Sequence, residues 1–171
     1  PFSSGVQAIT SRRFGRQNII DSKSRAHTGE ALDNGIVVAL YAAFFAFILS
    51  FIAQPVLGFL LNDNQIILLC MDYIRILRWA LVPLAFFVVI QGFFSAINKT
   101  SYVMYSGLLS NSLNILLNWV FIYGKLGFPA MGIRGAALGT LLATTLSTGF
   151  LLTILFFKGY TGKYRLFSFK H

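Results

Sequence analysis

The sequence predicts an all-α fold, a polytopic bundle of transmembrane helices. Hydrophobic residues make up 56% of the chain and charged residues only 11%, whereas soluble domains carry about 25% charged residues. Four long runs contain no charged side chain: residues 34–62, 79–98, 100–124 and 135–157. Each run reaches the roughly 20 helical residues that cross a hydrocarbon core of about 30 Å. Four such helices would be exceptional in one soluble core of this size.

The basic residues indicate how these helices are oriented. A net charge of +9 could suggest nucleic-acid binding, but nucleic-acid domains gather Lys and Arg on one soluble face. Here the 14 basic residues lie between the spans, ten on one side and four (Arg75, Arg78, Lys125 and Arg134) on the other. By the positive-inside rule the side with ten faces the cytoplasm. We therefore expect a lipid bilayer and no nucleic acid as a partner.

The N-terminal third is predicted to hold one complete span. Residues 1–11 have the pattern of the end of a spanning helix, and residues 12–32 form a basic cytoplasmic loop, in which Gly15 is a helix stop. The first complete span is predicted at 33–54, where Pro55 ends it.

The next segment, residues 55–77, is predicted to be external. Asn62, Asp63 and Asn64 offer oxygens that can cap a helix beginning near Gln65. Asp72 and Arg75 in that helix have the i, i+3 spacing of a surface ion pair, which contributes little to stability.

A second span is predicted at 78–98, with a kink at Pro83. Arg78 and Trp79 stand where anchors at the membrane interface are expected. Gln91 lies deep in this span and is its one strongly polar side chain. A polar side chain inside a spanning helix is a candidate functional residue.

The third span, predicted at 100–124, carries a row of asparagines. At 100° per residue Asn111, Asn114 and Asn118 fall within an arc of about 60° on one helix face. An amide in hydrocarbon costs several kcal/mol unless it finds a partner, so the row must face protein or water. We predict that it lines the cavity of a transporter. The alternative is hydrogen bonding between helices, worth about 0.6 to 2 kcal/mol per bond.

The rest of the chain is predicted to be a Gly/Pro-rich external turn at 125–134, a fourth span at 135–157 and a cytoplasmic linker at 158–171. The fourth span has a stripe of small residues that permits close helix contact, formed by Gly135, Gly139, Ala143 and Ser147. Beside it run Thr140, Thr144 and Thr148, whose hydroxyls either bond to carbonyls of their own helix or line the cavity.

Cysteine count and chain ends set further bounds. Cys70 is the only cysteine, which excludes an internal disulfide and a cysteine-based metal site. The chain has no initiator Met and no signal-peptide pattern at its start. We expect it to be an internal piece of a larger protein.

Three segments together resemble the multidrug and toxin extrusion (MATE) family, in particular its NorM-type branch. They are GVQAITSRRFG, YIRILRWALVPLAFFVVIQGFFSAINKT and SNSLNILLNWVFIYGKLGFPAMGIRGAALGT. The resemblance implies twelve helices in two lobes of six. This chain would supply the end of helix two and helices three to six of the first lobe, with the second lobe as its partner.

The resemblance also implies a secondary active antiporter, not an enzyme, that exports organic and often cationic compounds in exchange for Na⁺ or H⁺ by alternating access. Polar positions on helix five of the family correspond here to Asn114 and Asn118. Some branches have an Asp at the Asn118 position, and this sequence does not. We therefore expect the coupling carboxylate on helix one, with Asn114 and Asn118 hydrogen-bonded to it or coordinating Na⁺. The full set of candidate binding residues is Asn111, Asn114, Asn118, Gln91 and Thr140, with no cofactor besides the coupling ion.

Three rival functions remain open to test. A lipid-linked saccharide flippase of related architecture would line its cavity with cationic residues, yet no Lys or Arg lies mid-span. A membrane-embedded enzyme needs paired His, carboxylate or Ser–Lys groups within the spans, and His27 and His171 both fall in predicted cytoplasmic segments. A channel would need a filter-like loop or a charged ring. We expect a multi-pass exporter of small organic compounds in a bacterial inner (plasma) membrane.

Overall fold

The computed structural model describes residues 7–12, 22–60 and 63–160, and every element in these ranges is helical. The predictions for residues 1–6, 13–21 and 161–171 lie outside the described part. The elements are α2 (Ser22–Leu49), α3 (Ala53–Leu60), α4 (Asn64–Leu77), a 3-10 turn η1 (Arg78–Ala80), α5 (Leu81–Ala96), α6 (Thr100–Tyr123) and α7 (Ile133–Phe157). The all-α membrane bundle predicted from the sequence is confirmed.

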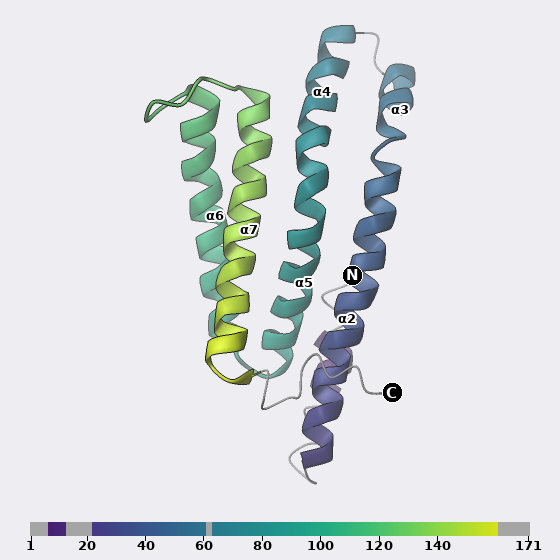
Figure 1. Cartoon of the computed structure of the whole chain (residues 1–171), viewed down its shortest axis with the longest axis vertical. Helices are drawn as coiled ribbons and strands as arrows, with labels where there is room; N and C mark the ends of the chain where they lie inside the picture. The colour runs from purple at the N-terminus through teal and green to yellow at the C-terminus, as the bar shows by residue number, and fades with distance from the viewer. Residues whose placement is uncertain (1–6, 13–21, 61–62, 161–171) are drawn as a thin grey trace.

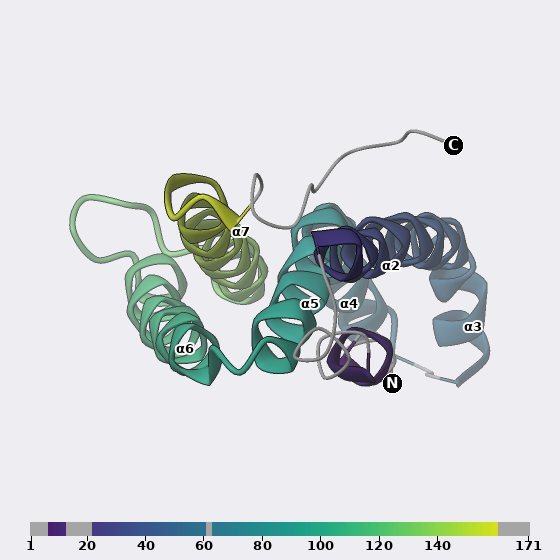
Figure 2. The same cartoon turned by 90° about the horizontal axis from the view of Figure 1, so that it is seen from below.

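The helices stand side by side along the long axis of the molecule (Figure 1). Seen from below, α5 lies between α2 and the pair formed by α6 and α7 (Figure 2). We call the end with the turn between α6 and α7 the predicted outer end. The opposite end, where Asn98 and Lys99 join α5 to α6, is the predicted inner end. The first turns of α4 rise above the α6–α7 turn at the predicted outer end (Figure 1).

Two segments are more helical than predicted. Residues 22–32, placed in the predicted loop 12–32, are the first turns of α2. Within the predicted external segment 55–77, α4 confirms the helix predicted to begin near Gln65, and α3 is a helix that was not predicted. The loop predictions rested on charged residues, but a helix does not have to end where the hydrocarbon ends. The prediction that Pro55 ends the first span is wrong. α2 ends earlier, at Leu49, and Pro55 lies in the first turn of α3, where proline is tolerated.

The predicted cap of α4 is confirmed, because the side chain of Asp63 accepts a hydrogen bond from the backbone N–H of Gln65 at 2.8 Å. From Asn64 the helix continues through η1 to Ala96. The tight turn η1 precedes Pro83, which has no N–H to donate to the carbonyl four residues earlier. These 33 residues extend about 50 Å, so this rod is longer than the roughly 30 Å hydrocarbon core.

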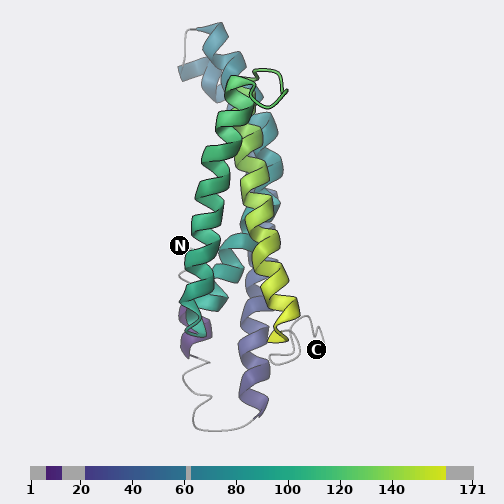
Figure 3. The same cartoon turned by 90° about the vertical axis from the view of Figure 1, so that its left-hand side faces the viewer.

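Within the described ranges three helical stretches are long and apolar enough to cross a membrane: Leu32–Leu49, Asn64–Ala96 and Ile133–Phe157. α6 is not among them, since its Asn and Ser side chains lower its mean hydropathy. It nevertheless runs beside α7 along its length (Figure 3). That position supports the prediction that residues 100–124 also cross the bilayer.

The predicted inner end is closed by a core between α2, α5 and α7, in which Phe93, Phe94 and Leu151 are fully buried. The ring of Phe94 meets that of Tyr102 edge to face at 5.4 Å. Lys158, just after α7, donates a hydrogen bond from Nζ to Tyr102 Oη at 2.6 Å. This bond raises the pKa of Lys158 above its ordinary value. The first turn of α6 is thereby tied to the end of α7.

Candidate functional site

The candidate site begins with how closely α6 and α7 approach each other. A Cβ atom added at Gly135 would lie 2.6 Å from the backbone carbon and oxygen of Phe121, so only glycine fits there. Gly139, four residues later, faces the side-chain oxygen of Asn118, and a Cβ added there would also lie 3.2 Å from the backbone nitrogen of Asn118. Small residues four apart permit such backbone contact between membrane helices. The stripe predicted from the sequence is buried over its whole length: Gly135, Gly139, Ala143 and Ser147.

Three of the predicted site residues form one hydrogen-bonded group across this interface. Asn118 Nδ2 donates to Asn114 Oδ1 at 3.0 Å, and Asn114 Nδ2 donates to Thr140 Oγ1 at 3.1 Å. Thr140 Oγ1 in turn donates to the carbonyl oxygen of Ala136 at 3.0 Å. We call Asn114, Asn118 and Thr140 the Asn–Thr cluster. It joins α6 to α7 and presents two amide oxygens and one hydroxyl.

One atom of the Asn–Thr cluster has no hydrogen-bond partner among the described residues. Asn118 Oδ1 is buried and lies against Gly139, so closely that a Cβ at that glycine would collide with it. A buried acceptor without a partner costs about 1–3 kcal/mol. Gly139 therefore does two things: it lets the helices touch, and it leaves the space that this amide oxygen occupies.

The other two predicted site residues lie apart from the cluster. Gln91 Nε2 donates to Ser106 Oγ at 3.2 Å and so links α5 to α6 nearer the predicted inner end. Ser106 Oγ donates further to the carbonyl oxygen of Val103 at 2.8 Å. Asn111 is on the exposed side of α6. The structure thus divides the row of asparagines: Asn114 and Asn118 are half-buried beside α7, whereas the side chain of Asn111 is exposed.

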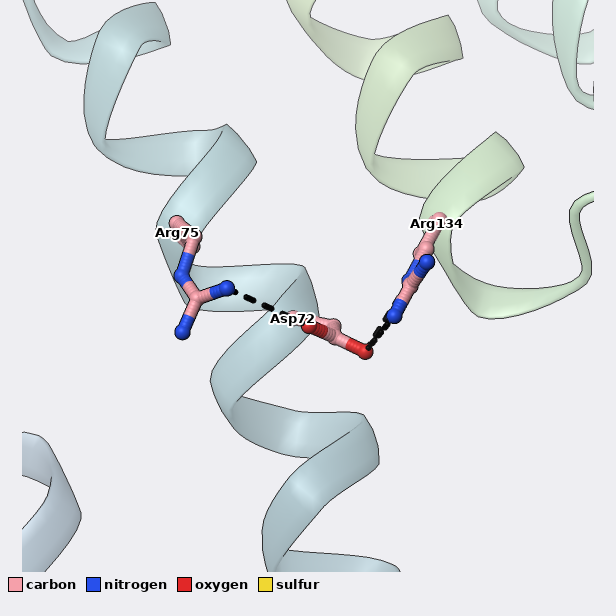
Figure 4. A network of polar contacts seen from close by, with 3 residues as sticks. All are labelled: Asp72, Arg75 and Arg134. Atoms are coloured by element: carbon pink, nitrogen blue, oxygen red, sulfur yellow. Dashed lines mark hydrogen bonds and ion pairs between the residues drawn. The ribbon is translucent and has the colours of Figure 1, made fainter.

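An ion pair at the predicted outer end was only half predicted. Arg134 donates to Asp72 Oδ2 from Nε at 2.9 Å and from Nη2 at 2.7 Å, which joins α7 to α4 (Figure 4). The predicted partner Arg75 is farther away, with Nη1 3.8 Å from Asp72 Oδ1. A signal was available, since Asp72 and Arg134 both stand in segments predicted to be external. However, the two residues are 62 positions apart in the sequence, so helical spacing does not predict that they pair.

Two of the three threonines beside the small-residue stripe, Thr140 and Thr148, bond to backbone carbonyls. Thr148 Oγ1 donates to the carbonyl oxygen of Thr144 at 2.7 Å and also contacts the carbonyl oxygen of Pro83 at 2.9 Å. The second contact ties α7 to α5 close to the proline that interrupts the hydrogen bonds of its helix. Thr148 therefore serves packing, whereas Thr140 is the one threonine of the stripe that also accepts from an asparagine.

Comparisons with known proteins agree with this architecture. A family model described as MatE matches residues 2–120. The probable multidrug resistance protein NorM of Mesorhizobium japonicum is 37% identical over 96 residues, covering 56% of this chain and 21% of that protein. The NorM protein of Agrobacterium fabrum is 26% identical over 166 residues, covering 97% of this chain and 34% of that protein.

Two solved structures show the same fold. The crystal structure of a MATE protein in the bent conformation gives a TM-score of 0.79 at 23% identity, covering 92% of this chain and 33% of that one. The inward-facing conformation of a multidrug resistance MATE family transporter of the MOP superfamily gives 0.78 at 22% identity, covering 91% and 34%. Against these relatives and structures the chain spans between a fifth and about a third of their length.

Proposed function

The chain belongs to the MATE family, and from this we propose that it forms part of a multidrug efflux transporter in a bacterial plasma membrane. The transporter exports organic, often cationic compounds in exchange for Na⁺ or H⁺. Its relatives in Mesorhizobium japonicum and Agrobacterium fabrum are named as probable multidrug resistance proteins, which supports the substrate class. The chain corresponds to the end of helix two and helices three to six of the first lobe.

The observation that carries the proposal is the Asn–Thr cluster with its unpartnered oxygen. Asn118 Oδ1 is a hard oxygen ligand, buried, and without a donor among the described residues. Asn114 Oδ1 and Thr140 Oγ1 belong to the same hydrogen-bonded group. Amide and hydroxyl oxygens suit Na⁺, and they also accept a hydrogen bond from a protonated carboxylic acid. We propose that Asn118 Oδ1 receives the coupling ion, or the acid on helix one that carries it.

The close packing around the cluster supports alternating access by rigid lobes. Gly135 brings the backbones of α6 and α7 into contact, and Arg134 ties α7 to α4. A lobe held in this way moves as one body, so the cluster keeps its geometry while the two lobes rock around the central cavity. Gln91 and Asn111 lie outside the cluster, and we assign them no part in ion binding.

The experiment is dye retention in pump-deficient bacteria that express the complete gene, with the Na⁺ and pH gradients varied separately. We expect export of a cationic dye that follows one gradient and stops when that gradient is collapsed. Absence of export for any cationic dye, with expression in the membrane verified, would overturn the antiporter proposal. Transport of lipid-linked saccharide intermediates would then be measured, because the flippase is the nearest alternative of related architecture.

A further inference from the structure

A second feature lies on the other side of the molecule, between α2 and α5. The two helices leave an apolar groove of about 250 Å³, lined by Ala39, Ala42, Ala43, Ala46, Leu81, Leu84, Ala85 and Val88. Both helices belong to stretches that are long and apolar enough to cross a membrane. Because the groove lies within these stretches, it is at the depth of the hydrocarbon core. It is open because alanine methyl groups leave the space that larger side chains would fill.

Arg78 lies at the outer end of this groove. Leu81 and Ala85, which line the groove, follow Arg78 at i+3 and i+7 and so lie on the same helix face. The guanidinium carbon of Arg78 is 4.4 Å from the ring centroid of Phe51 and 5.8 Å from that of Phe47. Phe47 in the last turn of α2 and Phe51 just after that helix hold the guanidinium by cation–π contact.

The charge of Arg78 is not balanced within the described part of the chain. The carboxylate of Asp72 is engaged by Arg134 and Arg75, and neither ion pair involves Arg78. Its Nε is buried and finds no acceptor there either. A guanidinium has five N–H donors in a planar fork that matches carboxylate and phosphate groups. An anion from outside these residues would complete the site.

The depth of Arg78 indicates which anion this is. From Ala96, at the predicted inner end of α5, to Arg78 the helix rises about 27 Å, close to the hydrocarbon thickness of roughly 30 Å. Arg78 thus stands at the level of lipid headgroups while the groove extends below it. The neighbouring Trp79 is 67% exposed, as expected for a tryptophan at the membrane interface.

We propose that Arg78 and the α2–α5 groove bind one phospholipid of the leaflet at the predicted outer end. The phosphate lies on the guanidinium, and one acyl chain lies along the alanines of α2. Phe47 and Phe51 position the guanidinium for the headgroup. The proposal rests on membrane insertion and not on transport, so it stands or falls separately from the antiporter function.

The test is native mass spectrometry of the purified complete transporter titrated with dioleoylphosphatidylglycerol. Arg78→Gln is expected to weaken binding of the first lipid about tenfold, the scale of a charge-assisted hydrogen bond. Arg78→Lys should recover part of the affinity, because the charge remains while the fork is lost. The matched control is Arg75→Gln, one turn earlier with a side chain that is 70% exposed, which should bind as the wild type does.

Two further arms separate the headgroup from the groove. Dioleoylglycerol, which has the same chains without the phosphate, should bind the wild type and Arg78→Gln equally. Ala42→Phe should weaken binding of both lipids, because it fills the groove and leaves Arg78 in place. Thermal unfolding of each variant verifies that it is folded. Equal binding of dioleoylphosphatidylglycerol by the wild type and Arg78→Gln would overturn the proposal. Absence of a bound lipid in the wild type would overturn it as well, and would indicate that another helix of the transporter covers the groove.

Discussion

The α6–α7 pair and the α2–α5 pair are both built from antiparallel apolar helices with small residues, yet they pack differently. Gly135 and Gly139 bring α6 and α7 into backbone contact, and the Asn–Thr cluster bonds across the interface. Between α2 and α5 the small residues are alanines, and a groove remains. Lipid tails are as apolar as leucine, so two helices in a bilayer gain little from apolar contact alone. Glycines opposite the backbone of α6 close the α6–α7 interface, whereas the alanines between α2 and α5 leave an apolar groove.

The largest expected effect comes from closing the space at Gly135. Gly135→Ala should lower the free energy of unfolding of the complete transporter by about 2–3 kcal/mol, the upper range for overpacking, because the new Cβ meets the backbone of Phe121. Gly149→Ala on the same helix is the matched control, with no atom within 4 Å of its new Cβ. It should be neutral or stabilise by up to about 1 kcal/mol. Denaturant unfolding measures both, and equal effects would contradict the close contact.

A double-mutant cycle measures how strongly the Asn–Thr cluster couples α6 to α7. Asn114→Ala and Thr140→Ala should each destabilise the transporter. Their coupling free energy should be about 1 kcal/mol, because the 3.1 Å hydrogen bond joins two helices in hydrocarbon. Thr145 bonds only to a carbonyl of its own helix, so Asn114→Ala with Thr145→Ala should show no coupling. A zero value for the first cycle would mean that the bond does not hold α6 to α7.

A smaller effect is expected at the predicted outer end. Arg134→Gln should cost about 0.5–1 kcal/mol, less at high salt, because its side chain is 64% exposed and the pair with Asp72 is screened by water. Arg75→Gln should cost less, since Arg75 lies at the longer distance from Asp72. The two variants are compared by thermal unfolding at low and high ionic strength. A larger effect of Arg75→Gln would reverse the assignment of the main partner.

The smallest effect is expected in the groove. Ala46→Leu should change the free energy of unfolding by no more than about 0.5 kcal/mol, because the added atoms enter empty space beside α5. The same unfolding assay measures it beside Gly135→Ala. A loss as large as that of Gly135→Ala would show that the α2–α5 interface is closed as tightly as the α6–α7 interface.

Much of the fold could be predicted because polar and Gly-rich turns separate the apolar helices in the sequence. The Asn98–Lys99 turn marks the start of α6, and the Gly-rich turn after Tyr123 separates α6 from α7. Both helices lie within two residues of the predicted ranges 100–124 and 135–157. The first turns of α2 were missed because their charged residues were taken as loop signals, whereas the helix beginning near Gln65 was predicted. The sequence places Asp72 and Arg134 on the same side of the membrane, but their contact could not be derived from it, since only the packing of α4 against α7 brings the two side chains together.

The candidate site residues could be predicted only in part, because their grouping depends on how the helices pack. Helical spacing placed Asn111, Asn114 and Asn118 on one face, but it did not show which edge of that face meets another helix. Gly139 on α7 decides this, because it opens the space for Asn118. Gln91 lies outside the cluster and donates instead to Ser106. The contact between α6 and α7 therefore decides which asparagines of the row belong to the Asn–Thr cluster, and this contact could not be read from helical spacing.

The most direct test of the Asn–Thr cluster compares Asn118→Leu with Asn111→Leu in the dye-export assay of the complete transporter. We expect Asn118→Leu to abolish ion-dependent export and Asn111→Leu to retain it, with both proteins inserted at wild-type levels. Unchanged export by Asn118→Leu would show that Asn118 has no part in ion coupling. Equal loss in both variants would contradict the proposed role of the cluster too, because the whole row of asparagines, and not the cluster at the α6–α7 interface, would then form the site.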